Sequence, residues 1–179
     1  AKGLVKRAIV RVVSPGTLTD SQHLDAREPS FLLCLTGSDP LLTKYVRRGS
    51  DPVVGVALLD LTTGEFSCAE YTGAAGLQAL VDEVLVLRPR EIVAPAGLDV
   101  SLVMGSAAER LPVTRVDDWT FEHESARRGL MDQFRTNGLE GFGLENRPAA
   151  VSAAGALLHY LRDTQKADLA HVRTIAYKT

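Results

Sequence analysis

The sequence predicts a mixed α/β fold in which one sheet is flanked by helices. The first observation is a pair of strand-like segments, 53–60 and 65–71, joined by a short turn as in a β-hairpin. The second is the alternation of helical and strand-like patterns between residues 74 and 116. Because such an alternation needs crossover connections, we expect a mixed sheet with right-handed crossovers and helices packed against it.

Four features precede the hairpin. Residues 8–13 are rich in β-branched side chains and stop at Ser-Pro-Gly-Thr (14–17), which predicts a strand ending in a tight turn. A short helix is expected over residues 19–27, where Thr or Asp can act as the cap. The apolar run 31–35 predicts a strand buried on both faces. The long loop 37–52 carries Gly-Ser-Asp-Pro at both ends, around a segment that can form two helical turns.

The hairpin and the segments after it follow in order. Gly64 ends the hairpin turn, where a positive φ is needed. Leu77, Leu80, Val81 and Val84 then form an apolar helical stripe that stops before Pro89. Further along we expect a short strand at 91–94, a helix capped by Asp99 that runs to Arg110, and a strand at 112–116. These segments complete a layer of five strands, counted from the strand at 31–35.

The last third of the chain is expected to hold two more helices. The first runs from about Glu124 to Arg135 and ends at Asn137-Gly138. Pro148 opens the second after a glycine-rich hinge, with Val151, Ala154, Leu158 and Leu161 on its apolar face. The sequence stops soon after the strand-like segment 174–177, before any further element could cover that face. We therefore expect this helix to begin a new unit of a longer polypeptide.

Composition and charge limit the classes of function. The 179 residues are 45% hydrophobic and 23% charged, which is typical of a globular chain. No apolar run reaches the roughly 18–20 residues that span a bilayer, and the N-terminus lacks the apolar core of a signal peptide, so we expect a cytoplasmic protein with no membrane partner. Residues 49–145 hold 7 basic and 16 acidic side chains. Phosphate would repel this acidic region, which argues against a direct DNA-binding module.

Asp60, at the end of a hairpin strand, allows two interpretations. Together with Glu70, Asp82, Glu83 or Asp99 it can hold two magnesium ions for phosphodiester hydrolysis. Alternatively, it accepts hydrogen bonds from Thr62, Thr63 or Gly64 in the turn that follows, as Asp commonly does. The spacing of these carboxylates is not diagnostic, and the second interpretation is favoured.

Other catalytic chemistries lack their motifs. The histidines, at positions 23, 123, 159 and 171, have no partners at metal-ligand spacing. No serine lies in a nucleophile elbow, and no phosphate loop or dinucleotide fingerprint is present. Cys34 and Cys68 are expected to be reduced core thiols, with a reactive role as the alternative. Lys44, Arg47 and Arg48 form a small basic patch that is either a nucleic-acid contact or a solvated face.

Four segments, 10–17, 59–66, 139–145 and 153–165, together resemble the MutS family of bacterial mismatch-recognition ATPases. With Arg88-Pro89 and Trp119 they cover nearly the whole chain at the spacing of that family. The resemblance implies that residues 1–20 leave the mismatch-binding domain, residues 21–145 form the connector domain, and residues 146–179 begin the core and lever region. It also implies a ribonuclease-H-like fold for the connector, followed by a C-terminal helix from the next domain.

The resemblance implies a role without catalysis. In the family the connector links mismatch sensing to the ATPase and docks MutL. The family's mismatch-reading Phe-x-Glu motif and phosphate loop are absent here, so we expect no catalytic, cofactor or metal residues in this chain. ATP and magnesium belong to the full-length protein, which also contacts mismatched DNA. The loop 37–52 is longer than the family leads us to expect.

Residues 126–134 match the family's Ala-Arg-x-x-Leu-x-x-Gln-Phe pattern and form our candidate docking helix for a MutL-type partner. Arg127, Arg128 and Gln133 are the partner-binding residues that we predict. On helical geometry alone, the interpretation of Arg127 and Arg128 as solvated residues on the outer face of the helix is favoured. Two other functions stay open at this stage: a metal-dependent nuclease on the same fold, and a direct DNA-binding module.

Overall fold

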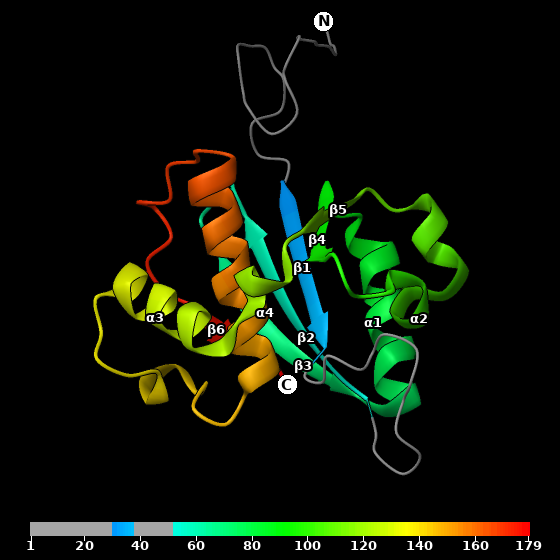
Figure 1. Cartoon of the computed structure of the whole chain (residues 1–179), viewed down its shortest axis with the longest axis horizontal. Helices are drawn as coiled ribbons and strands as arrows, with labels where there is room; N and C mark the ends of the chain where they lie inside the picture. The colour runs from blue at the N-terminus through cyan, green and yellow to red at the C-terminus, as the bar shows by residue number, and fades with distance from the viewer. Residues whose placement is uncertain (1–29, 38–51) are drawn as a thin grey trace, which may run out of the picture.

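The computed structural model describes residues 30–37 and 52–179 (Figure 1). Elements expected within residues 8–27 and 40–48 lie outside these ranges. In the described part, six strands form one mixed sheet in the spatial order β5-β4-β1-β2-β3-β6. The strands are β1 (Phe31–Gly37), β2 (Val53–Asp60), β3 (Phe66–Thr72), β4 (Glu91–Pro95), β5 (Val113–Val116) and β6 (Ala176–Tyr177). The expected mixed α/β fold is confirmed, with one strand more than the five expected.

The sheet has an antiparallel centre, with parallel pairings towards both edges, where β6 is parallel to β3. β1, β2 and β3 are antiparallel neighbours, whereas β4 is parallel to β1 and β5 is parallel to β4. Gly64 has a φ of +81° in the β2–β3 turn, as the sequence predicted. β1 lies inside the sheet and is buried over residues 32–36, which explains its continuous apolar run.

Helices cover both faces of this sheet. They are α1 (Gly73–Leu87), α2 (Val100–Met104), α3 (His123–Phe134) and α4 (Pro148–His159). Short helical turns connect them: η1 (Gly105–Arg110), η2 (Asp118–Phe121), η3 (Glu140–Phe142) and the π-helical turn η4 (Tyr160–Thr164). No helix among the described residues is both long and apolar enough to cross a membrane.

Two helix ends differ from expectation. The helix predicted from Asp99 to Arg110 ends early, because Gly105 adopts a φ of +59° and the chain continues as η1. Asp99 still caps it, accepting the backbone N–H of Ser101 at 3.0 Å. α3 ends at Phe134, within one residue of the end expected at Arg135. Arg135 itself takes the left-handed conformation and its N–H donates to the carbonyl of Met131, so Asn137-Gly138 does not terminate the helix.

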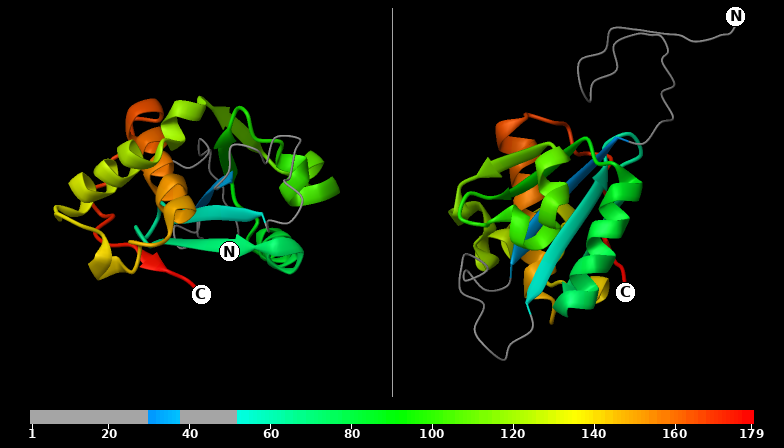
Figure 2. Two further views of the ribbon diagram at one scale, coloured as in Figure 1. Left: turned by 60° about the horizontal axis from the view of Figure 1, so that its bottom comes forward. Right: turned by 90° about the vertical axis from the view of Figure 1, so that its right-hand side faces the viewer.

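The two faces of the sheet carry separate hydrophobic clusters, and different helices cover each face (Figure 2). α3 and α4 lie on one face, over inward-pointing residues such as Leu32, Cys34 and Leu59. α1 and α2 lie on the other face, over residues such as Leu33 and Val56. Alternate residues of β1 and β2 therefore point to opposite sides, and the result is a three-layer arrangement of helices, sheet and helices.

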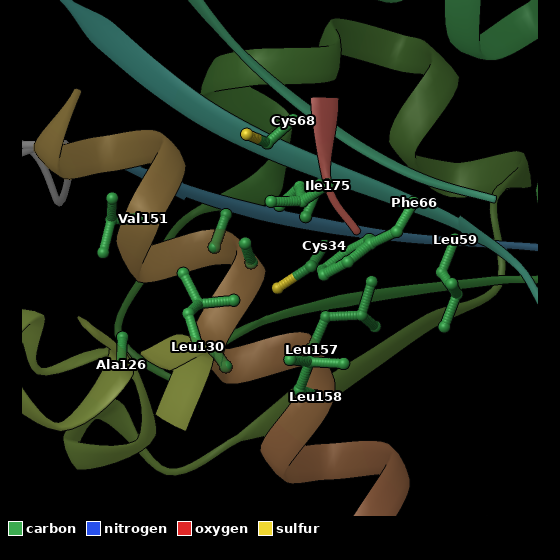
Figure 3. Packing of buried hydrophobic residues seen from close by; sticks show 14 of the residues in the cluster. Cys34, Leu59, Phe66, Cys68, Ala126, Leu130, Val151, Leu157, Leu158 and Ile175 are labelled. Carbon is green, nitrogen blue, oxygen red and sulfur yellow. The ribbon is translucent and has the colours of Figure 1, made fainter. Parts of the chain in front are cut away.

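α4 corrects the expectation that its apolar face would be uncovered. Val151, Leu157 and Leu158 are buried in the cluster between the sheet and α3, as Figure 3 shows. α4 lies this close to the sheet because β2 has a glycine, Gly55, opposite Ala149, where a Cβ would collide with the Ala149 carbonyl. The helix therefore belongs to the same core as the sheet. The division at residues 20 and 145 into parts of a larger protein stays a prediction.

Candidate functional site

Asp60 has the turn-stabilising role that the sequence favoured. One carboxylate oxygen accepts the backbone N–H of Thr62 at 2.9 Å and that of Ser30 at 3.2 Å. The residue is buried at the end of β2, so these hydrogen bonds replace the water that its carboxylate loses on folding. Asp60 thereby ties the β2–β3 turn to the residue that precedes β1.

Glu70 has a different structural role. Its carboxylate, on β3, accepts the backbone N–H groups of Ala149 at 2.9 Å and Ala150 at 3.1 Å, in the first turn of α4. Arg147, the residue before that helix, supplies no side-chain cap, so Glu70 satisfies these amides from a distant strand. Across the described residues, no three His, Cys, Asp or Glu side chains could share a metal ion. The geometry gives the nuclease hypothesis no support.

Both cysteines are free thiols inside the core, as expected. Burial raises the pKa of the Cys68 thiol to about 12, and Glu70 adds to the shift. Burial alone raises the pKa of Cys34 far above its ordinary value. Because the thiolate is the reactive form, these thiols are poorly suited to nucleophilic chemistry.

The three predicted partner-binding residues do not share one face of α3. Successive residues of an α-helix are about 100° apart, which spreads positions 127, 128 and 133 around its circumference. Arg128 is exposed, whereas Arg127 is partly buried. Gln133 is partly buried, and its side chain is hydrogen-bonded within the chain. The basic patch at residues 44–48 lies outside the described residues.

Trp119, on η2, is an exposed aromatic side chain that the sequence motifs did not indicate as a site. It is 63% exposed, yet its ring is held in place. Its Nε1 donates to Asp117 at 3.2 Å, and its ring meets His159 edge to face at 5.3 Å between centroids. His159 is in turn paired with Asp163 at 2.7 Å. A rigid, exposed tryptophan is the kind of residue that anchors protein interfaces.

Two hollows flank this tryptophan. One, of about 240 Å³, lies towards β5 and is lined partly by Arg115 and Tyr160. The other, of about 70 Å³, lies between α3 and α4 and is lined partly by Ser125 and Gly129. A Cβ at Gly129 would meet nothing within 4 Å, so no neighbour in the described structure requires a glycine there. Glycine in a helix interior costs about 1 kcal/mol relative to alanine, and here it leaves the hollow open.

Glu122 lies beside the smaller hollow, because it is hydrogen-bonded to Ser125, which lines that hollow. Glu122 caps α3 by accepting the N–H groups of Glu124 and Ser125. Its pKa is lowered, first by the Ser125 N–H and also by the nearby positive charge of Arg128. We call Trp119, Ser125, Arg128, Gly129 and His159 the Trp119 surface. It presents an ordered aromatic ring, an open hollow and an exposed guanidinium, which suits a protein partner better than a small substrate.

The family match decides the class of protein. The sequence profile of MutS domain II matches residues 40–173, which include α3, α4 and the whole Trp119 surface. The chain belongs to the MutS domain II family. This confirms the resemblance inferred from the four sequence segments.

Named relatives agree with the family. The chain is 37% identical to the DNA mismatch repair protein MutS of Desulfatibacillum aliphaticivorans, over 98% of this chain and 18% of that protein. It is 39% identical to MutS of Symbiobacterium thermophilum, over 98% of this chain and 19% of that protein, and 40% identical to MutS of Solibacter usitatus, over 99% and 18%. The chain thus spans about a fifth of the length of these MutS relatives.

The segments that carried the MutS resemblance occupy structural positions in this domain II. Residues 59–66 form the β2–β3 turn with Asp60. Residues 139–145 form the connection around η3, in which Leu139 and Leu144 are buried. Residues 153–165 form most of α4 and its π-helical end. These three segments thus maintain the fold, and the last of them also supplies His159 of the Trp119 surface.

Proposed function

We propose that this chain is a connector module of a MutS mismatch-repair protein and has no catalytic activity of its own. The observation that carries this proposal is that Asp60 and Glu70 bind backbone amides, while close-packed helices cover both sheet faces. The order of three antiparallel strands followed by two parallel crossover strands supports a ribonuclease-H-like topology. ATP, magnesium and mismatched DNA are then engaged by other domains of the full-length protein.

The proposed partner of this module is a MutL-type protein, which docks on the Trp119 surface. Trp119 supplies a large apolar anchor that is already ordered, so little side-chain entropy is lost on binding. The hollow at Gly129 accepts a side chain of the partner, and Arg128 sets the register by pairing with an acidic group. Of the three residues predicted from the sequence, Arg128 alone is part of this docking surface.

A capture experiment tests this docking. Immobilised MutL-type protein from the same organism should retain the chain, and Trp119→Ala should reduce capture by about tenfold or more, as expected for a buried aromatic anchor. Arg128→Glu should reduce it less and should make capture less sensitive to salt. Leu102→Ala and Arg110→Glu are matched controls, because both residues are exposed near α1 and α2. Equal capture of all variants would reject the Trp119 surface as the docking site.

A further inference from the structure

Gln133 makes an unusually complete set of hydrogen bonds for a helix-surface residue. Its side-chain Nε2 donates to the carbonyl oxygens of Leu169 at 3.1 Å and Val172 at 3.0 Å. Its Oε1 accepts a hydrogen bond from Arg162 at 3.0 Å. One amide group on α3 thus uses both of its N–H donors and its carbonyl oxygen on the chain that follows α4.

The segment reached by Gln133, residues 165–178, runs past α3 and the β2–β3 turn to the edge of the sheet. We call this segment the strap. Its apolar residues are buried in the α3–α4 cluster: Leu169, Val172 and Ile175. His171 Nε2 lies 2.8 Å from the carbonyl oxygen of Leu61, and Gly64 leaves room for the His171 backbone. The strap then forms β6 beside β3, where the Lys178 N–H donates to the Cys68 carbonyl at 2.8 Å.

We infer that Gln133 is a positioning residue that fixes the strap to α3, so that α3 sets the path of the chain leaving the sheet. The strap has little regular structure of its own, since only its last residues pair with a strand. Segments of this kind open locally at lower free energy than the core, unless side chains hold them. This inference does not depend on the proposed docking of a partner.

Hydrogen–deuterium exchange on the full chain tests the role of the amide. Gln133→Glu keeps the size of the side chain but removes both N–H donors. We expect peptides within residues 166–178 to exchange about tenfold faster, which is the effect of losing one to two net hydrogen bonds, while peptides of β1 and β2 remain as protected as before. Gln78→Glu is the matched control, because among the described residues the Gln78 amide donates to Asp82, on the exposed side of α1 and away from the strap. It should leave strap exchange unchanged.

A second variant separates hydrogen bonding from simple packing. Gln133→Met keeps the length and packing of the side chain but removes its N–H donors without adding a charge beside Arg162, so it should open the strap as Gln133→Glu does. The inference is overturned if either variant leaves strap exchange at the wild-type rate. Equally faster exchange throughout the sheet in Gln133→Glu would also overturn it, because the strap would then open only with the whole fold.

Discussion

α4 and α1 pack on opposite faces of the same sheet in contrasting ways. α4 has 12 residues, and nine of them are buried, because the helix lies between the sheet and α3. α1 is longer, at 15 residues, yet only Leu80 and Val84 are buried. Leu85 and Val86 on its outer side are 44% and 81% exposed. The two helices therefore use different sequences for the same task of covering a sheet.

The difference shows how small residues allow close approach. Between Ala149 and Ala156, α4 carries mostly alanine and glycine, and Gly155 faces Ala126 of α3 so closely that a Cβ would overlap its backbone. α1 instead uses large aliphatic residues on one stripe and leaves its other side to solvent. A helix that is apolar on all sides is an interior helix, whereas a striped helix is a surface helix. Substitutions that change side-chain volume should accordingly destabilise the fold more on α4 than on α1.

The largest expected effect comes from truncating a side chain on each of these helices. Leu157→Ala, at a fully buried position of α4, should lower the free energy of unfolding by about 3 kcal/mol, through lost burial and the cavity that remains. Leu85→Ala on α1 should change it by about 0.5 kcal/mol or less, because that side chain is already half exposed. Urea unfolding measures both values. Equal losses would show that the two faces are packed alike.

Two glycines on the α3–α4 side provide the next comparison. Gly155→Ala should destabilise the fold by about 2 kcal/mol, because the added Cβ forces α4 away from Ala126. Gly129→Ala should instead stabilise it by about 0.5–1 kcal/mol, since the methyl group meets open space and alanine favours the helix. Thermal unfolding followed by circular dichroism distinguishes the signs. Stabilisation by Gly155→Ala would contradict the close contact of the two helices.

Much of the fold could be predicted because it depends on local patterns. The alternating strands, the Gly64 turn, the α1 stripe and the Pro148 helix start are all encoded within about ten neighbouring residues. The pairing of β6 with β3 could not be predicted in this way, because it joins Ser67 to Ala176 across more than a hundred residues. The burial of the apolar face of α4 could not be predicted for the same reason, because distant segments, the sheet and α3, cover that face.

The candidate site was predictable only in part. The pattern in residues 126–134 indicated α3, but periodicity does not show which side of a helix neighbouring elements occupy. Gln133 is polar and surface-like in sequence, yet it binds carbonyls 36 and 39 residues away. Trp119 was noted only as part of the MutS resemblance. The available signal for an interface was a lone tryptophan in the acid-rich segment 117–124, because aromatic residues are enriched at protein interfaces.

The buried thiols extend the comparison to alkaline pH, because Cys34 and Cys68 both lie in the α4-side cluster. Burial raises both pKa values from an ordinary value of 9.0, that of Cys68 to about 12. The unfolded chain therefore loses thiol protons first as pH rises, and stability falls from about pH 9 upward. At pH 10 each buried thiol should lower the free energy of unfolding by about 1.4 kcal/mol.

The measurement compares wild type with the Cys34→Ala, Cys68→Ala double variant in urea at pH 8 and pH 10. The variant should lose less stability than wild type over this interval, whatever its stability at pH 8. Tyr71 and Tyr160, whose pKa values are also raised to about 12, are present in both chains and cancel in the difference. Identical pH dependence would mean that solvent reaches the thiols on the α4 side.

The N-termini of the two helices give the smallest expected effect. Glu70→Gln should destabilise the fold by about 1 kcal/mol, because a neutral amide replaces the carboxylate at the positive end of α4. α1 begins after Thr72 with no side-chain cap, so Thr72→Asp should stabilise by about 0.5–1 kcal/mol. Urea unfolding at low and high salt checks both, and Glu65→Gln, at an exposed position outside any helix, is the neutral control. If Glu70→Gln were as neutral as that control, the Glu70 carboxylate would not stabilise the start of α4. The position of α4 on the sheet would then depend on apolar packing alone.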